Sequence, residues 1–194
     1  AFWKACKMYN TEVACILNKW DVNSTDYPQV CNAALALHRE YEFMGTGCLD
    51  PKFLKTDLKV DKMMKKGYEL DKKNDANKPR HRAIVWACPA HYYTNFTYWA
   101  QHCWGVKTVV DMECMLSHHF IHVGDKKEAM IDLAKSYEKM MMRSHTNGGY
   151  QNSLDECWKM CERFNVNIVI MYDHVSCKNV GGLHGLFEDQ ARER

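Results

Sequence analysis

Cysteine and histidine side chains follow three short apolar segments of this chain, at the points where those segments end. The three groups are Cys88 with His91 after residues 83–87, Cys114 with His118 and His119 after residues 106–112, and His174 with Cys177 after residues 166–172. Thiolates are soft ligands that suit iron–sulfur clusters, and imidazole can hold or release a proton near neutral pH. If the apolar segments are neighbouring parallel strands, their carboxyl ends share one edge of a sheet, which is where open α/β sheets bind ligands. Cys177 and Cys88 are therefore the two thiols best placed to hold one ligand together.

The last of these groups, in residues 166–194, has the clearest pattern. The apolar run 168–171 predicts a buried parallel strand, and Gly181 and Gly182 lead into a helix. That helix repeats apolar residues at Leu183, Leu186, Phe187 and Ala191. The positive amino end of the helix would lower the pKa of a nearby thiol and favour an anionic cluster. The pattern alone leaves a second interpretation open, in which Cys177 is a buried thiol that holds no ligand.

Apolar periodicity predicts the secondary structure that positions these residues. Helices are expected over 1–20, 28–44, 50–70, 94–103, 126–142, 151–164 and after residue 182, and strands over 83–87, 106–112 and 166–172. From residue 80 onwards the order β-α-β-α-α-β-α predicts an α/β fold with a doubly wound parallel sheet. The polar stretch 72–82 predicts a boundary between a helical linker region, 1–75, and a C-terminal α/β (Rossmann-like) cluster-binding domain, 80–194. Helical patterns at both ends predict a piece of a longer polypeptide whose last domain is truncated.

The composition excludes several classes of protein. With 46% hydrophobic residues over 194 positions the chain can bury a core, so we do not expect wholesale disorder. A net charge of +2, from 26 basic and 24 acidic residues, gives no electrostatic reason to expect a nucleic-acid partner. The lysine run at 62–66 is expected to be a solvated face, because Asp57, Asp61 and Glu69 are interspersed around it. No apolar run approaches the ~18 residues of a membrane span and nothing resembles a signal peptide, so we expect a cytoplasmic protein with no membrane partner.

Ten cysteines in a long helical chain without a secretion signal predict reduced thiols rather than a disulfide framework. The chain has no CxxC pair, which removes support for a zinc ribbon or a thioredoxin-like site. Cys157 and Cys161 lie on one apolar stripe of a predicted helix and are expected to pack as small hydrophobic residues. We expect the same of Cys6, Cys15 and Cys31. The histidines at positions 118, 119 and 122 are expected to lie on a surface loop, because their spacing does not put all three on one helical face.

Residues 91–99 follow Cys88 closely and contain five aromatic side chains. Such side chains can wall a flat hydrophobic pocket from which water is excluded, although the packing of a helix explains some of them. The chain has no glycine-rich dinucleotide fingerprint, no P-loop and no GxSxG elbow. Composition and spacing therefore point to a soft metal site beside an aromatic pocket, and not to a nucleotide or hydrolase site.

Several segments together resemble the benzoyl-CoA reductase and 2-hydroxyacyl-CoA dehydratase family over nearly the whole chain. They are AFWKACKMYN at the start, ALALHREYEFMG in the second predicted helix, IVWACPA around Cys88, LAKSYEKMMMR in a later helix, and DHVSCKNVGGLHGLFEDQARER around Cys177. The HVSCK segment is the most specific of these. The sequence is most similar to the B-type subunit of ATP-dependent benzoyl-CoA reductases, in its C-terminal part.

The resemblance implies a function that spacing alone does not. Members of the family hold a [4Fe–4S] or double-cubane cluster between two α/β domains and usually pair with a homologous second α/β subunit. A separate ATP-hydrolysing activator supplies low-potential electrons one at a time, and an acyl-CoA substrate is reduced or dehydrated. Cys177 matches the cluster ligand of the C-terminal domain, and Cys88 matches another cysteine of the family. The remaining ligands belong to an N-terminal domain that this sequence does not include.

The resemblance also suggests roles for other residues near the two thiols. His174 is the candidate general acid that gives a proton or hydrogen bond to a reduced thioester oxygen, although it could equally cap the end of the strand. Tyr93, Asn95 and Phe96 are the candidates for the acyl pocket.

The first expectation is an iron–sulfur catalytic subunit that reduces an aromatic acyl-CoA by single-electron transfer. Three alternatives remain open. They are a 2-hydroxyacyl-CoA dehydratase subunit, a double-cubane protein that reduces small molecules, and a non-catalytic subunit that only scaffolds a cluster-bearing partner.

Overall fold

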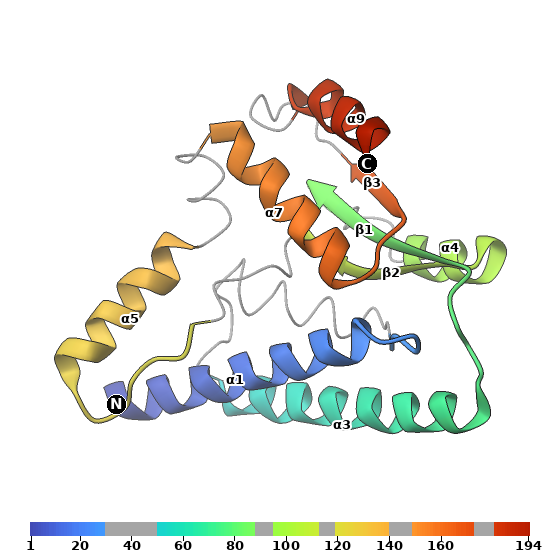
Figure 1. Ribbon diagram of the computed structural model, residues 1–194. Helices are drawn as coiled ribbons and strands as arrows, with labels where there is room; N and C mark the ends of the chain where they lie inside the picture. The colour runs from blue at the N-terminus through green and yellow to red at the C-terminus, as the bar shows by residue number, and fades with distance from the viewer. Residues whose placement is uncertain (30–49, 88–94, 113–118, 140–148, 173–180) are drawn as a thin grey trace.

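A computed structural model describes residues 1–29, 50–87, 95–112, 119–139, 149–172 and 181–194 of the chain. Two long helices lie side by side below a three-stranded sheet, and further helices lie above and beside that sheet (Figure 1). The elements are α1 (Phe2–Asn23), α3 (Pro51–Asn74), β1 (His81–Ala87), α4 (Phe96–Trp104), β2 (Val106–Asp111), α5 (Lys126–Glu138), α7 (Gly149–Arg163), β3 (Ile168–Tyr172) and α9 (His184–Glu193). This architecture confirms the predicted α/β class.

The sheet is parallel throughout, with the strand order β2-β1-β3. The central strand β1 pairs with β2 on one side and with β3 on the other, so Val85 lies opposite Asp111 and Ala87 lies opposite Tyr172. The chain therefore moves from β1 out to one edge of the sheet and then crosses back to the other edge. That pattern of connections is the one expected for a doubly wound sheet.

The main core joins the sheet to α1, α7 and α9. Its central residue is Trp86 of β1, which is fully buried, lies 6.3 Å from the ring of Phe187 on α9 and donates a hydrogen bond to Ser153 on α7. The other buried members are Ile16, Trp20, Ile84, Val109, Val110, Met112, Leu154, Cys157, Trp158, Met160 and Phe164. Because α1 contributes Ile16 and Trp20, the first helix packs within the same core as the strands.

The start of β1 is held by a buried arginine that sequence reasoning placed in a polar boundary. The guanidinium of Arg82 donates to the backbone carbonyls of Phe164, Thr25 and Asn23. Arg82 also exchanges two hydrogen bonds with Asn167, just before β3, since its N–H donates to the Asn167 side chain and its carbonyl accepts from the Asn167 N–H. These bonds explain why a charged residue lies inside a strand, and they fix where β1 and β3 begin relative to each other.

Several predicted helix faces differ from the observed ones. On α5 only Ala129 and Ser136 are buried, while Met130 and Tyr137 are exposed, because α5 lies to one side of the sheet (Figure 1). On α9 the ring of Phe187 is buried, and Leu186 faces solvent. The helix predicted over 28–44 falls almost wholly outside the described residues. No helix in the described ranges combines the length and hydropathy that crossing a membrane requires.

We expect Arg82→Met to lower the free energy of unfolding by about 3 kcal/mol, because the substitution leaves buried backbone carbonyls without their donor. Urea unfolding followed by circular dichroism measures the change. The matched control is Arg163→Met, which removes an exposed guanidinium from α7 and should cost less than about 1 kcal/mol. Equal losses in the two variants would show that Arg82 is not the anchor of the strand.

Candidate functional site

The carboxyl ends of β1 and β3 mark the topological switch point of this sheet. The chain leaves β1 toward one edge, through α4 to β2, and leaves β3 on the opposite side of β1, into α9. In open α/β sheets such a switch point is where ligands bind, because the two loops diverge and leave a crevice between them. Ala87 and Tyr172 are paired across β1 and β3, so the loops that begin at Cys88 and Asp173 start side by side. The predicted arrangement of the strands is thus confirmed.

Four of the predicted site residues, Cys88, Tyr93, His174 and Cys177, lie outside the described residues. Their roles therefore stay predictions, supported by the strand ends from which their loops depart.

The other two predicted residues, Asn95 and Phe96, lie at the start of α4. Asn95 is the exposed N-cap residue, and its carbonyl accepts the first hydrogen bond of the helix from the N–H of Trp99. The ring of Phe96 is half-buried, 6.2 Å from the ring of Trp99. Tyr98 and Trp99 are exposed, so these two aromatic side chains do not enclose a dry pocket within the described residues. A role for Asn95 and Phe96 in an acyl pocket remains a prediction.

A buried carboxylate stands at the same edge of the sheet. Asp111 is the last residue of β2, is 1% exposed and lies opposite Val85 of β1. An apolar strand that ends in an acidic residue is the sequence signal for it. The carboxylate of Asp111 therefore stands near the carboxyl end of β1, after which the sequence continues to Cys88.

An aspartate of α5 organises the described part of the histidine loop before that helix. His119 Nε2 lies 2.9 Å from Asp132 Oδ1, and the backbone N–H of His122 donates to Asp132 Oδ2 at 2.8 Å. These two bonds hold the pKa of Asp132 below its usual range, and the bond from the His122 N–H has the larger effect. Within the described ranges, His, Cys, Asp and Glu side chains nowhere form a group of three or more that could hold a metal ion.

A buried charged cluster between α1 and α3 escaped sequence reasoning. Lys19 of α1 and Asp57 of α3 form an ion pair at 1% and 2% side-chain exposure, and Glu12 and Asp61 are buried beside them. Burial raises the pKa of Glu12 to about 8, with a smaller contribution from the negative charge of Asp57. Glu12 therefore keeps its proton at neutral pH. The signal in the sequence is that Glu12 and Lys19 share the apolar face of their helix with Ile16.

Most described cysteines pack as predicted. Cys6, Cys15 and Cys157 are buried, and Cys161 packs against the main core. Burial and the charge of Asp57 raise the pKa of Cys15 to about 12, which makes that thiol a poor nucleophile. Cys103 differs from these because it is exposed on α4, and Cys31 lies outside the described residues.

The whole chain, residues 1–194, matches the model of a protein family described as 2-hydroxyglutaryl-CoA dehydratase, D-component. No curated protein and no solved structure matches the chain. The match agrees with the family that the sequence segments resemble.

The proton on Glu12 gives the fold a pH dependence. The unfolded chain ionises Glu12 near pH 4.5, whereas the folded protein holds the proton to about pH 8. The folded state therefore binds more protons in this window, and the free energy of unfolding falls by up to ~1.4 kcal/mol for each pH unit of increase. Glu12→Gln should remove this dependence, and its advantage over the wild type should grow as the pH rises from 4.5 to 8.

Urea unfolding at a series of pH values measures this difference. The control is Glu69→Gln on an exposed turn of α3, which should leave the wild-type pH dependence in place. If Glu12→Gln unfolds with the same pH dependence as the control, Glu12 is ionised in the folded protein.

Proposed function

We propose that this chain, which belongs to the 2-hydroxyglutaryl-CoA dehydratase D-component family, is an iron–sulfur subunit acting on a CoA thioester by single-electron transfer. The observation that carries the proposal is the strand order. It pairs Ala87, which directly precedes Cys88, with Tyr172 at the end of β3, five residues before Cys177, and this pairing supports a shared site for the two thiols. Thiols on neighbouring loops at a switch point are suited to one shared soft metal centre.

The donor chemistry at this edge fits a cluster. Cys88 follows the last residue of β1 directly, and Cys177 lies in the loop that joins β3 to α9. Clusters of this kind take four cysteine ligands, so other residues of the assembled protein would complete the set. A bound cluster would supply low-potential electrons. Helix α9 begins at His184, after the N-cap residue Leu183, and its positive amino end would favour an anionic cluster.

The residues of this chain would have distinct tasks at that edge. Cys177 and Cys88 hold the metal centre, and His174, two residues beyond β3, holds a proton for the thioester oxygen. Trp86 and Phe187 pack beneath the edge and keep the strands in fixed positions. Asn95 and Phe96 at the start of α4, with Tyr93 before them, would contact the acyl group.

Two substrates have separate support. The description of the family favours a 2-hydroxyacyl-CoA that is dehydrated to an enoyl-CoA. The HVSCK segment around Cys177 favours an aromatic acyl-CoA that is reduced, as in benzoyl-CoA reductases. Both need the same partners, namely a homologous second α/β subunit and an ATP-hydrolysing activator that donates electrons in the cytoplasm.

We expect Cys177→Ala to lower the iron content of the protein prepared without oxygen, because the substitution removes one thiolate ligand. Iron analysis and electron paramagnetic resonance of the reduced protein measure the loss. The matched control is Cys103→Ala, which removes an exposed thiol from α4 and should change neither readout. Unchanged iron and an unchanged resonance signal in Cys177→Ala would favour the alternative of a non-catalytic scaffold subunit.

The two substrates are separated by turnover of the complex with its activator, ATP and reductant. With a 2-hydroxyacyl-CoA, a dehydratase should release an enoyl-CoA and recycle its electron. With benzoyl-CoA, a reductase should release a dienoyl-CoA and consume electrons in proportion to product. Failure to convert either thioester, with the iron intact, would point to the alternative of a double-cubane protein that reduces small molecules.

A further inference from the structure

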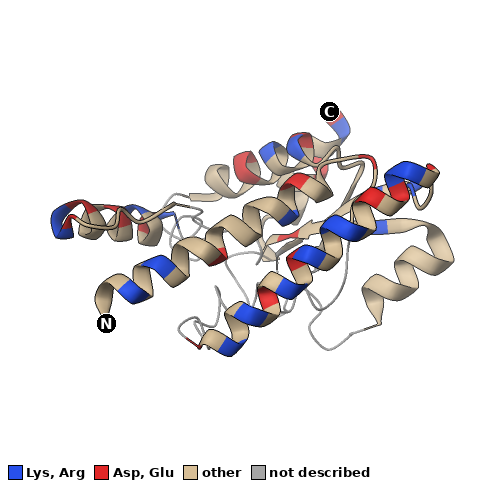
Figure 2. Ribbon diagram, turned by 90° about the horizontal axis from the view of Figure 1, so that it is seen from below, with Lys and Arg blue, Asp and Glu red and all other residues tan. Residues whose placement is uncertain are grey.

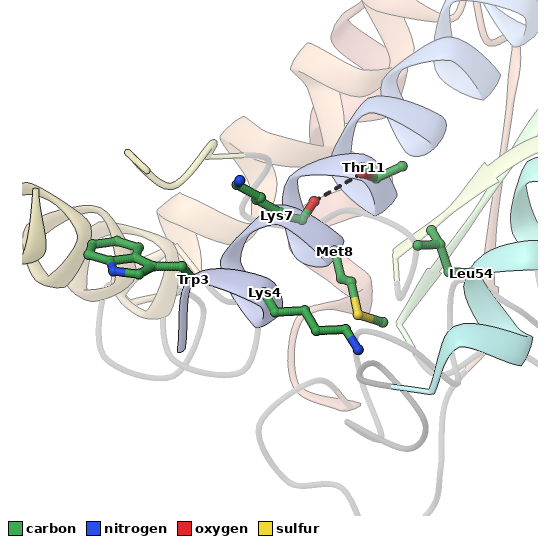
Figure 3. Close-up of a pocket in the computed structure, with 6 residues that line it drawn as sticks. All are labelled: Trp3, Lys4, Lys7, Met8, Thr11 and Leu54. Atoms are coloured by element: carbon green, nitrogen blue, oxygen red, sulfur yellow. Dashed lines mark hydrogen bonds between the residues drawn. The ribbon is translucent and has the colours of Figure 1, made fainter. Parts of the chain in front are cut away.

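Helices α1 and α3 border a shallow trough with an apolar floor. It consists of two adjoining hollows of about 390 and 440 Å³, which share Leu54 as a lining residue. Met8 from α1 and Leu58 from α3 continue the floor on either side of Leu54. Figure 3 shows Met8 and Lys4 reaching from α1 toward Leu54. Each hollow has a volume within the range of ~300–1,000 Å³ that is common for sites of small ligands.

The rim of this trough is basic. Lys4 and Lys7 line the first hollow, and Lys55, Lys59 and Lys62 line the second. Among the described residues that line the two hollows, none carries a carboxylate. We call this surface, defined by these five lysines around Met8, Leu54 and Leu58, the lysine trough.

The two acidic residues in the first half of α3, Asp57 and Asp61, are buried and are not among the described residues that line the trough. Asp57 is buried against Lys19 of α1, and Asp61 is buried on the same side, 3.2 Å from Lys65. In the first half of α3 the sequence intersperses acids and lysines, but Asp57 and Asp61 are buried whereas Lys55, Lys59 and Lys62 are exposed. Figure 2 shows the lysines of α3 at successive turns of the helix.

A ligand that fits this surface combines several negative charges with an apolar part. We infer that the lysine trough binds the coenzyme A portion of the thioester substrate, with its phosphates on the lysines and its pantetheine arm on the apolar floor. The inference rests on the proposed function, which supplies a CoA thioester as the substrate. Lysines bind phosphates as point charges, and Lys55 and Lys62 are separated by about 10.5 Å along the helix, which allows them to meet different phosphate groups.

The position of the trough agrees with this ligand. In Figure 1 the three strands point toward the side of the molecule on which α1 and α3 begin. The trough is formed by the first halves of those two helices. A CoA molecule held there thus lies on the same side of the molecule as the edge of the sheet where the thiol-bearing loops begin.

The test compares two double variants of the same helix that remove the same charge. Lys55→Ala with Lys59→Ala changes the trough, and Lys72→Ala with Lys73→Ala changes exposed lysines at the far end of α3. Calorimetric titration of the assembled protein with coenzyme A should give roughly fivefold weaker binding for the first variant and no change for the second. Pantetheine, which has no phosphate, should bind all three proteins equally.

Other outcomes overturn the inference. If both double variants bind coenzyme A with equal affinity, Lys55 and Lys59 do not contact coenzyme A. If Lys55→Ala with Lys59→Ala weakens pantetheine binding as much as coenzyme A binding, the two lysines do not bind the phosphates. Unchanged coenzyme A affinity with slower electron delivery from the activator would identify the trough as a surface for an acidic protein instead. The titration measures binding and needs no turnover. A protein that contains no iron would therefore refute the proposed function, while the titration would still show where coenzyme A binds.

Discussion

The parallel pairing of β1 with both of its neighbours is the constraint on which the rest of the structure depends. A central strand has no free edge, so its position fixes where the loops after it and after β3 begin. At the amino end, Arg82 and Asn167 exchange backbone and side-chain hydrogen bonds. At the carboxyl end, Trp86 packs against α9. The strand is thus held at both ends, with Ala87 paired to Tyr172 at the carboxyl end of β3.

Helices α1 and α3 are joined by a buried ion pair. This pair fixes the orientation of the two helices relative to each other more than it adds to the free energy of unfolding. Removing Lys19 and Asp57 from water is costly, and their attraction offsets that cost only if the pair is well placed. A third charge would upset this balance, and the proton held by Glu12 prevents that. The same pairing turns the acidic face of α3 inward and leaves its lysines on the rim of the trough. One buried ion pair therefore decides the character of the outer surface.

The strands and their parallel direction could be predicted from the sequence. The apolar runs predict the three strands, and the helices between them predict a parallel sheet, because parallel neighbours need crossover connections. Sequence reasoning failed where tertiary contacts override local polarity. Arg82 and Lys19 look like surface residues in the sequence, and only the carbonyls or carboxylate that they meet across the fold explain their burial. The exposed side chains Met130 and Tyr137 show the converse, since helical periodicity predicts a face but not whether anything covers it.

The connection between α3 and β1 links the trough to the edge of the sheet. Lys107 of β2 is buried, and its ammonium group donates to the carbonyls of Pro28, after α1, and Asn77, between α3 and β1. The first of these bonds satisfies the carbonyl of the buried residue Pro28, and the second attaches the turn after α3 to β2. Lys107 therefore joins β2 to the segments that follow α1 and α3, the two helices that border the trough, so that the sheet and both helices share one buried ammonium group.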